Sequence, residues 1–363
     1  MSIPLVDLKA QLPEIREEVR AGFERIIDNT AFILGGEVQS FEEAFAAFCG
    51  TKHAIGVGNG TDALELALRA LGVGPGDEVI VPANSFIASA LAISRAGGTP
   101  VFVDCDETHQ LIDPTQLKSV ITSNTKAVMP VHLFGQIAPM QAIRDAVGSL
   151  PIIEDAAQAQ GAKQGEVSAG GFGAIAATSF YPGKNLGAFG DGGAVMTNDD
   201  ALADKVRALR NYGSTIKYHH PETGFNSRLD PLQAVVLNAK LKRLAKWNAM
   251  RRAAAARYDE MLEGVDVVRP GTLEGNEHIW HLYVVRVQNR DAVLKTLNEA
   301  GIGAGIHYPV PIHLQGAFAD VGHRAGDFPV AEKAAKEILS LPLFPEITAD
   351  QQARVVDVLK KAL

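Results

Sequence analysis

Short apolar runs alternate with segments of helical periodicity along the first 200 residues of the chain. Four of these runs predict strands: residues 53–57, 78–82, 101–104 and 127–132. Between them, segments such as residues 62–71 and 139–147 have apolar residues at helical spacing. Strands that alternate with helices in this way predict an α/β fold with a mostly parallel sheet, covered by helices on both faces.

Two further helices are predicted ahead of this alternation, at residues 13–27 and 40–48, separated by a break at Gly35 and Gly36. After the alternation, residues 213–229 lack any regular pattern. Loops of this length are usually functional or disordered, so we expect this segment to matter for function.

A long helix is predicted to lead into a second, smaller unit. Asp230 followed by Pro231 is a favourable helix start, and the helical pattern continues past Tyr258. The remaining pattern predicts a smaller α+β unit with a strand at 278–287 and helices at 290–300, 329–339 and 350–363. We therefore expect an N-terminal arm and large domain over residues 1–245 and a small domain over residues 246–363.

Composition narrows the class of protein. With 47% apolar and 21% charged residues, the 363-residue chain is typical of a soluble globular protein. Its net charge of −8 argues against non-specific nucleic-acid binding. Cys49 and Cys105 are far apart and indicate reduced thiols in the cytoplasm. We find no signal peptide and no membrane-spanning run. We also expect no metal site, because the adjacent His219 and His220 lack acidic or thiol partners at ligand spacing.

The strongest candidate chemistry is a lysine in a glycine-rich turn. Lys184 lies within SFYPGKNLGAFGDGG (residues 179–193), which follows a small apolar strand. About thirty residues earlier, Asp155 follows another apolar strand. A lysine and a carboxylate at one sheet edge suit pyridoxal phosphate, because the lysine can bond its aldehyde and the aspartate can keep its ring nitrogen protonated. Ligands of such sheets bind at the carboxyl ends of the strands.

Four further residues are predicted near the same edge. The turn before Gly60 and Thr61 leads into a helix whose N-terminus suits a phosphate, although such turns are common in α/β proteins and a structural role alone is an alternative. Ser179 could offer a hydroxyl to an anion. Phe86 precedes a helix, where an aromatic face can either stack on a ring or simply join the core.

The segment Asp155–Gln158, together with SFYPGKNLGAFGDGG, resembles the DegT/DnrJ/EryC1/StrS family of sugar aminotransferases, and the resemblance extends from Pro4 to the last helix. It implies the fold-type I architecture of aspartate aminotransferase, with a mostly parallel seven-stranded sheet in the large domain and a smaller α+β C-terminal domain. It also implies pyridoxal 5′-phosphate as the cofactor.

The resemblance assigns roles to individual residues. Lys184 would bind the cofactor and act as the general acid–base, and Asp155 would hold the ring nitrogen. The matching family positions indicate that Gly60 and Thr61 bind the cofactor phosphate, that Phe86 stacks on the ring and that Gln158 bonds the ring hydroxyl. Gln158 could instead cap the segment that follows it.

The resemblance also concerns the partner and the substrate. In the family, the residue that matches Asn226 contacts the cofactor phosphate of the other subunit, which implies a homodimer with shared active sites. The loops resemble those of enzymes that aminate C3 of dTDP-3-keto-6-deoxyhexoses with L-glutamate as donor. Candidate substrate-binding residues, each with a structural role as the alternative, are Tyr181, Tyr218, His307 and His313. Two positions depart from many relatives: Gln160 replaces histidine and Ser85 replaces threonine.

Other functions stay open from the sequence. The same chemistry could act on a 4-keto nucleotide sugar or a keto-cyclitol. A dehydratase of the family would have histidine in place of Lys184, and a non-catalytic, cofactor-binding regulator would tolerate loss of Lys184 or Asp155. Because both residues are present, the sequence favours an aminotransferase.

Overall fold

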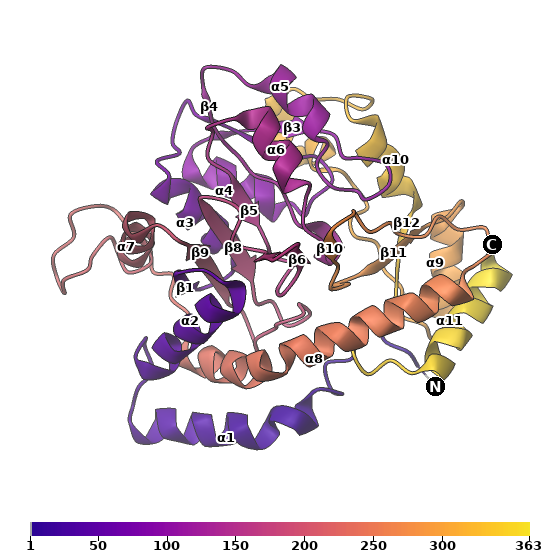
Figure 1. The fold of residues 1–363 in the computed structure, drawn as a ribbon, viewed down its shortest axis with the longest axis horizontal. Coiled ribbons are helices and arrows are strands. Elements are labelled where there is room, and N and C mark those ends of the chain that lie inside the picture. The colour runs from indigo at the N-terminus through magenta and orange to yellow at the C-terminus, as the bar shows by residue number, and fades with distance from the viewer. Residues whose placement is uncertain (1) are drawn as a thin grey trace.

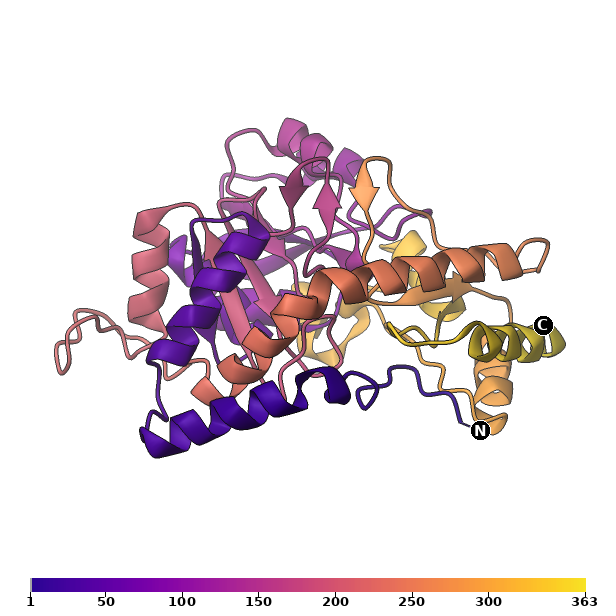
Figure 2. The ribbon, with the colours of Figure 1, turned by 60° about the horizontal axis from the view of Figure 1, so that its bottom comes forward.

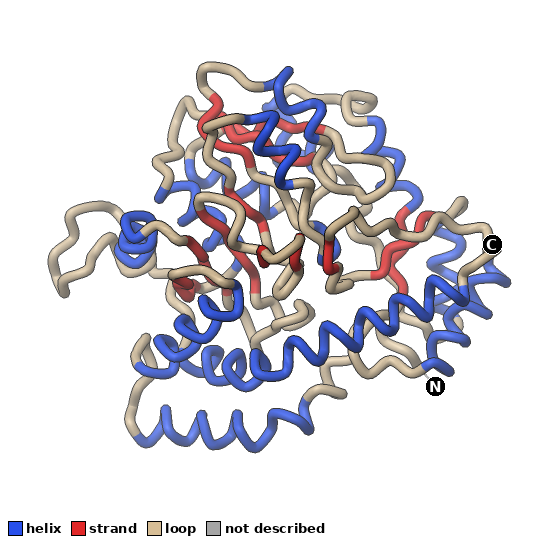
Figure 3. The backbone as a smooth tube through the Cα atoms, viewed as in Figure 1, coloured by secondary structure: helices blue, strands red, loops and turns tan. Residues whose placement is uncertain are grey.

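A central sheet with helices on both faces organises the fold of residues 2–363, which a computed structural model describes (Figures 1 and 3). Its strands are β1 (His53–Val57), β2 (Glu78–Pro82), β3 (Thr99–Val103), β4 (Thr125–Val128), β5 (Ile153–Asp155), β8 (Ile175–Ser179) and β9 (Gly193–Thr197). Strands β1-β9-β8-β5 form one block and β3-β2-β4 another, and parallel bridges at Val128–Ile152 and Val131–Asp155 join the two. Only β9 runs antiparallel to its neighbours, which confirms the predicted mostly parallel seven-stranded sheet.

The two faces of the sheet contribute to two different hydrophobic cores. In β2, Ile80 packs into one core, and Val79 and Val81 pack into the other. The first core also contains residues of α2 (Gly36–Cys49), α6 (Met140–Val147) and α8 (Pro231–Met261). The second contains residues of α3 (Gly60–Ala70), α4 (Ala88–Ala96) and α7 (Asp200–Leu209). Burial on both faces explains why these strands are continuous apolar runs in the sequence.

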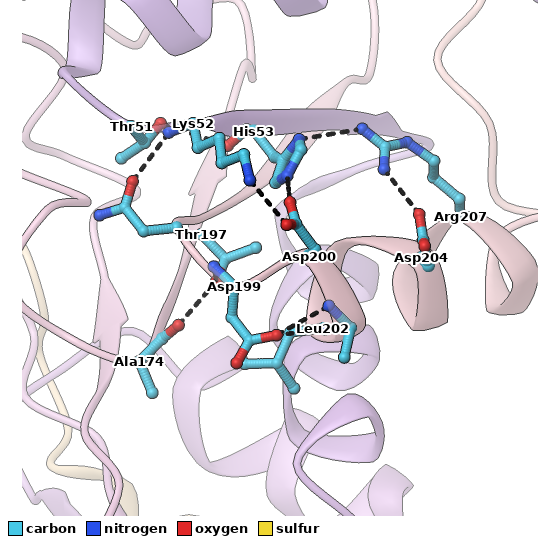
Figure 4. Close-up of polar contacts among 12 residues, drawn as sticks. Thr51, Lys52, His53, Ala174, Thr197, Asp199, Asp200, Leu202, Asp204 and Arg207 are labelled. Carbon is cyan, nitrogen blue, oxygen red and sulfur yellow. Dashed lines mark hydrogen bonds and ion pairs between the residues drawn. The ribbon is translucent and has the colours of Figure 1, made fainter.

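Polar contacts fix the edge of the sheet where β1 begins (Figure 4). Asp200 pairs with Lys52 and with His53, at 2.6 Å in each case. Asp199 caps α7 by accepting from two backbone N–H groups, and Arg207 donates to His53. These ion pairs are largely exposed, so each contributes little stability by itself. Together, these contacts hold α7 against the amino end of β1. The carboxyl end of β1 lies at the opposite edge of the sheet.

The long helix α8 connects the sheet region to a smaller unit (Figure 2). That unit has β11 (Tyr283–Arg286) paired antiparallel with β12 (Ile338–Leu341), and it contains α9 (Arg290–Glu299), α10 (Pro329–Glu337) and α11 (Ala349–Ala362). It has its own core, which also takes in Ile3 of the N-terminal arm. The domain boundary between residues 245 and 246 stays a prediction. Although α8 has 31 residues, neither it nor another helix of residues 2–363 is long and apolar enough to cross a membrane.

The remaining elements are short or lie at the periphery. Helix α1 (Leu12–Asp28) packs along α8. The others are β6 (Lys163–Gln164), β7 (Val167–Ser168), β10 (Asn276–Glu277), α5 (Leu117–Val120), and the 3₁₀ turns η1 (Pro114–Gln116), η2 (Leu133–Gly135), η3 (Ile312–Leu314) and η4 (Gly316–Val321).

Two predicted elements of the small unit differ from the structure. The strand predicted at 278–287 is limited to β11. The N–H of Ile279 donates to the carbonyl of Gly135, in a distant part of the chain, and Trp280 has a positive φ, which interrupts the extended backbone. The helix predicted at 329–339 ends at Glu337, and the next four residues form β12. A short, mostly apolar segment such as Ile338–Leu341 fits a helix end or a buried strand equally well, and pairing with β11 decides between them.

We predict that Phe45→Ala lowers the free energy of unfolding by about 3–5 kcal/mol, because a buried aromatic ring leaves a cavity when removed. Phe45 is 1% exposed, and its ring meets that of Phe180 edge-on at 5.3 Å. Urea denaturation measures the change. Val268→Ala, at a position that is 51% exposed, is the control and should change stability by less than about 0.5 kcal/mol. Equal effects of the two substitutions would contradict this packing.

Candidate functional site

A cavity of about 630 Å³ opens at the carboxyl ends of the strands. Its lining includes most of the residues predicted from the sequence: Gly60, Thr61, Phe86, Asp155, Gln158, Ser179, Tyr181, Lys184 and His307. Further lining residues come from the N-terminal arm (Leu5 and Val6) and from the small unit (His281 and Leu282). The site therefore lies between the sheet and the smaller unit.

The direction of the strands explains this convergence. Asp155 is the last residue of β5 and Ser179 is the last residue of β8. The turn after β1 leads into α3 at Gly60. Since β1, β5 and β8 run in the same direction, their carboxyl ends meet at one sheet edge.

Close backbone approach makes glycine necessary in two places. A Cβ atom on Gly60 would lie 2.5 Å from the Cβ of Ser179, and one on Gly193 would lie 2.4 Å from the carbonyl oxygen of Asn59. The Asn59 side chain accepts from the N–H of Asp62 and so caps α3. The N–H groups of the first helical residues, Gly60 and Thr61, have no intrahelical partner. This end of α3 is a suitable place for a phosphate.

Asp155 is a buried carboxylate with two donors. Its Oδ1 accepts from the N–H of Ala157 at 3.1 Å, and its Oδ2 accepts from the hydroxyl of Ser89 at 2.7 Å. Burial raises the pKa of Asp155, whereas these two hydrogen bonds and the positive charge of Lys184 act in the opposite direction. A cation held against this carboxylate, such as a protonated pyridine ring, would offset the cost of burial.

Lys184 lies in the cavity wall, in the loop after β8. Burial lowers the pKa of its ammonium group to about 8, because the charged form loses contact with water. The negative charge of Asp155 only partly opposes this effect. Within residues 2–363, Asp155 is the only charged group that affects the pKa of this amine, and no side-chain hydrogen bond does so. An amine of this kind is largely available for covalent bonding at slightly alkaline pH.

Helix α8 anchors the loop that carries Lys184. The ammonium group of Lys240 donates to the carbonyl of Gly187 at 2.6 Å, and the side chain of Gln233 accepts from the N–H of Phe189 at 2.8 Å. These contacts restrict the conformations that the loop can adopt around the reactive amine.

Phe86 and Gln158 both contact Tyr308, which our sequence analysis did not identify. The ring of Phe86 is half exposed in the cavity and lies 5.2 Å from that of Tyr308. The Gln158 side chain accepts from the N–H of Phe134 at 2.6 Å and donates to the Tyr308 hydroxyl at 3.1 Å. The Gln158 amide thus holds Phe134 and Tyr308 in position and also lines the cavity.

Of the four candidate substrate-binding residues, two line the cavity. Tyr181 is exposed there. His307 makes a hydrogen bond of 2.8 Å with the hydroxyl of Ser340 through its Nδ1. Burial, together with the charge of Lys184, lowers the pKa of His307 to about 4, so its imidazole is neutral at pH 7. It can therefore donate and accept hydrogen bonds without carrying charge.

His313 does not lie in the cavity, contrary to our expectation for a substrate-binding residue. It is 2% exposed, its ring packs 4.7 Å from that of Phe328, and its Nε2 contacts Glu332 of α10 at 3.1 Å. The turn η3 packs into the second core and directs His313 away from the site.

Tyr218 and Asn226 also lie outside the cavity of their own chain. Both belong to the 213–229 loop, which extends from the body of the molecule beside α7 (Figure 1). Tyr218 is 81% exposed, and Asn226 forms a single bridge with Asn211. Any contact of these residues with an active site would involve another copy of the chain.

The cavity residues that the sequence did not identify include Tyr308, His281, Leu5 and Val6. Tyr308 follows His307, so its position in the same loop was a usable signal. His281 lies in the stretch predicted as a regular strand, where nothing marked it. The arm residues are distant in sequence, and backbone hydrogen bonds of Ile3 with the 301–303 segment and of Leu5 with Leu343 bring them near the site.

The residues present fit pyridoxal phosphate. The α3 N-terminus suits its phosphate, Asp155 suits its ring nitrogen, and Lys184 suits its aldehyde. Fold and site together define a fold-type I enzyme that depends on this cofactor.

The comparison with known proteins gives the family. Residues 13–360 match the DegT/DnrJ/EryC1/StrS aminotransferase family, and the chain belongs to it. The chain is 47% identical to the dTDP-3-amino-3,4,6-trideoxy-alpha-D-glucose transaminase of Streptomyces venezuelae, over 99% of this chain and 96% of that protein. It is also 47% identical to a protein of Geobacillus stearothermophilus named pleiotropic regulatory protein, over 98% and 97% of the two chains.

A solved structure gives the same result for the fold. The chain matches S. venezuelae DesV in complex with a ketimine intermediate, with a TM-score of 0.97 and 47% identity over 99% of this chain and 98% of that one. The fold-type I architecture expected from the sequence is thereby confirmed.

We predict that covalent attachment of pyridoxal phosphate to the apo-protein accelerates as the pH rises through about 8, because only the neutral amine of Lys184 reacts. Borohydride trapping followed by peptide mass spectrometry measures the rate and the site. Lys184→Ala is the control and should show no attachment at this position. A midpoint near the ordinary lysine pKa of about 10.4 would contradict the lowered pKa.

Proposed function

We propose that this protein is a pyridoxal phosphate-dependent aminotransferase that converts a dTDP-linked 3-keto-6-deoxyhexose into the 3-amino sugar, with L-glutamate as the amino donor. The presence of Lys184 and Asp155 in the lining of one cavity, where their charges interact, is the observation that carries the proposal. The name of the S. venezuelae relative supports the choice of a dTDP-linked 3-amino sugar.

Each cavity residue has a proposed role toward the cofactor. The N–H groups of Gly60 and Thr61, with the hydroxyl of Ser179, would bind the phosphate. Phe86 would cover one face of the ring and Gln158 would bond its hydroxyl. When bound, pyridoxal phosphate supplies an aldehyde for amines and a ring that accepts electrons.

Lys184 and Asp155 would share the proton chemistry. The Nζ of Lys184 would hold the cofactor covalently and, when free, would move a proton at the α-carbon of the donor. The carboxylate of Asp155 keeps the proton on the ring nitrogen. Ping-pong kinetics follow, because the amino group leaves one substrate before the other binds.

Tyr181 and His307 would contact the sugar. Each combines an apolar ring with a polar group, which suits packing on a sugar face and bonding its hydroxyls. Because the pKa of His307 is lowered to about 4, it would serve as a neutral hydrogen-bonding group in this role.

We further propose a homodimer in which the 213–229 loop of each chain completes the site of the other. Lys184 is the only lysine or arginine in the described cavity lining, and its amine is reserved for the cofactor. Several anionic groups must nevertheless bind: the cofactor phosphate, the donor carboxylates and the nucleotide diphosphate. The extended loop carries Lys217, Tyr218, Asn226 and Arg228 and could supply polar and cationic groups from a partner. We place the enzyme in the cytoplasm, a location supported by its two buried, unpaired cysteines.

The name of the G. stearothermophilus relative favours a regulator as the second candidate function. A regulator has no need of a reactive amine facing a buried carboxylate, and both are present here. An activity assay separates the two functions.

We predict that the purified enzyme with L-glutamate adds one amino group to a dTDP-3-keto-6-deoxyhexose, detected by mass spectrometry. The panel should include 4-keto sugar nucleotides, keto-cyclitols and UDP-linked sugars. Lys184→Ala should lower turnover at least 1,000-fold, a loss typical of catalytic nucleophiles, while it still binds the cofactor non-covalently. Amination of 4-keto sugars alone would overturn the substrate assignment, and no amination at all would favour the regulator.

We predict that mixed dimers recover activity from two inactive variants. Lys184→Ala and Asn226→Ala would each be impaired alone, because each removes one contributor from both sites. In a mixed dimer, one site receives Lys184 from one chain and Asn226 from the other, both intact. Co-expression with two affinity tags isolates this species, whose activity should approach half that of the wild type. No recovery would contradict shared sites.

A further inference from the structure

Two serine hydroxyls lie in line behind the carboxylate of Asp155. The Oγ of Ser89 is 2.7 Å from Oδ2 of Asp155, and the Oγ of Ser85 is 2.7 Å from the Oγ of Ser89. Ser89 lies in the first turn of α4 and has no exposed surface. Ser85 lines the cavity. The two hydroxyls thus connect the Oδ2 atom of the buried Asp155 to a second point on the wall of the site.

The charge of Asp155 sets the direction of these hydrogen bonds. An ionised carboxylate only accepts, so the single proton of the Ser89 hydroxyl points to Asp155. Ser89 then has only lone pairs left for its neighbour, so Ser85 must donate to Ser89. Having used its proton in this way, Ser85 offers only an acceptor to the cavity.

We propose that Ser89 and Ser85 form a relay that couples the charge of Asp155 to the hydrogen-bonding character of the cavity wall. Ser89 is a positioning residue that keeps Asp155 ionised and oriented. When Asp155 takes up a proton, it donates to Ser89, both hydroxyls turn, and Ser85 presents its O–H to the cavity. The inference deepens the proposed function, on which it depends for the role of Asp155 toward the ring nitrogen.

Other groups also act on Asp155. Lys184 approaches from the loop after β8, His132 from the segment between β4 and η2, and Tyr308 from the 301–313 loop. Burial is the largest influence and raises the pKa of Asp155. Among the interactions that lower it, the hydroxyl of Ser89 is the strongest. When no cation is bound, the relay is therefore the strongest local interaction that opposes the effect of burial on the pKa of Asp155.

The relay has a consequence for what binds beside it. While Asp155 is ionised, Ser85 favours a ligand group that donates a hydrogen bond, such as a hydroxyl or an N–H. A protonated Asp155 reverses this preference. The wall of the cavity would thus respond to the charge state of the group bound against Asp155.

NMR of the apo-protein labelled with [¹³C]aspartate tests the relay without any cofactor or substrate, and Asp155→Asn identifies the signal. Ser89→Ala should raise the pKa of Asp155 by about one unit, because the lost hydrogen bond favoured the charged form. Ser85→Ala should raise it less, since it only polarises the Ser89 hydroxyl. Ser94→Ala, an exposed position of the same helix, is the matched control and should leave this pKa unchanged.

The outcomes separate the relay from a packing role and from the proposed function. If Ser89→Ala changes the melting temperature but leaves the pKa of Asp155 unchanged, the relay is wrong, whatever the enzyme aminates. If the pKa moves as expected but no keto sugar is aminated, the relay stands and the proposed function fails. In the loaded enzyme, pyridoxal phosphate labelled with ¹⁵N in its ring should show a shift toward the unprotonated form in Ser89→Ala; an unchanged shift would also count against the relay.

Discussion

The electrostatic balance between Asp155 and Lys184 is the constraint on which the rest of the site depends. Burial works against the charge of both groups: it raises the pKa of the carboxyl and lowers that of the amine. Each charge partly stabilises the other across the cavity. The surrounding structure then supplies neutral donors to Asp155, through Ser89 and the N–H of Ala157, rather than a second permanent cation. This leaves the carboxylate with room for a positive ring nitrogen.

The fold places Asp155 and Lys184 at a buried sheet edge, where their opposite charges can stabilise each other. Parallel pairing sets Asp155 at the end of β5 opposite Ala177, two residues before β8 ends at Ser179. Helices on both faces exclude water from the sheet beneath them. The turn after β1 can approach β8 closely only because Gly60 has no side chain. The site thus depends on three features together: the direction of the strands, the absence of a side chain at Gly60, and the opposite charges of Asp155 and Lys184.

The sequence was sufficient for features that depend on local pattern. The strands are apolar on both faces, so their runs were visible, and Lys184 and Asp155 were found because polar residues at strand ends stand out. Features that depend on packing were not visible. His307 and His313 are the same residue type in one loop, so the sequence assigned them the same role. In the structure, His307 lines the cavity, whereas His313 packs against Phe328. Similarly, the use of Ile338–Leu341 as β12 depends on a partner strand more than fifty residues away.

The N-terminal arm has a consequence for how the molecule is made. Ile3 exchanges backbone hydrogen bonds with Gly301 and Gly303, and Leu5 accepts from the N–H of Leu343. Leu5 and the next residue line the cavity. Residues 3–5 must therefore remain unpaired until residues 301–343 have been synthesised. Ordering the arm closes a loop of about 300 residues, which is entropically costly, so this wall of the cavity should form among the last steps of folding.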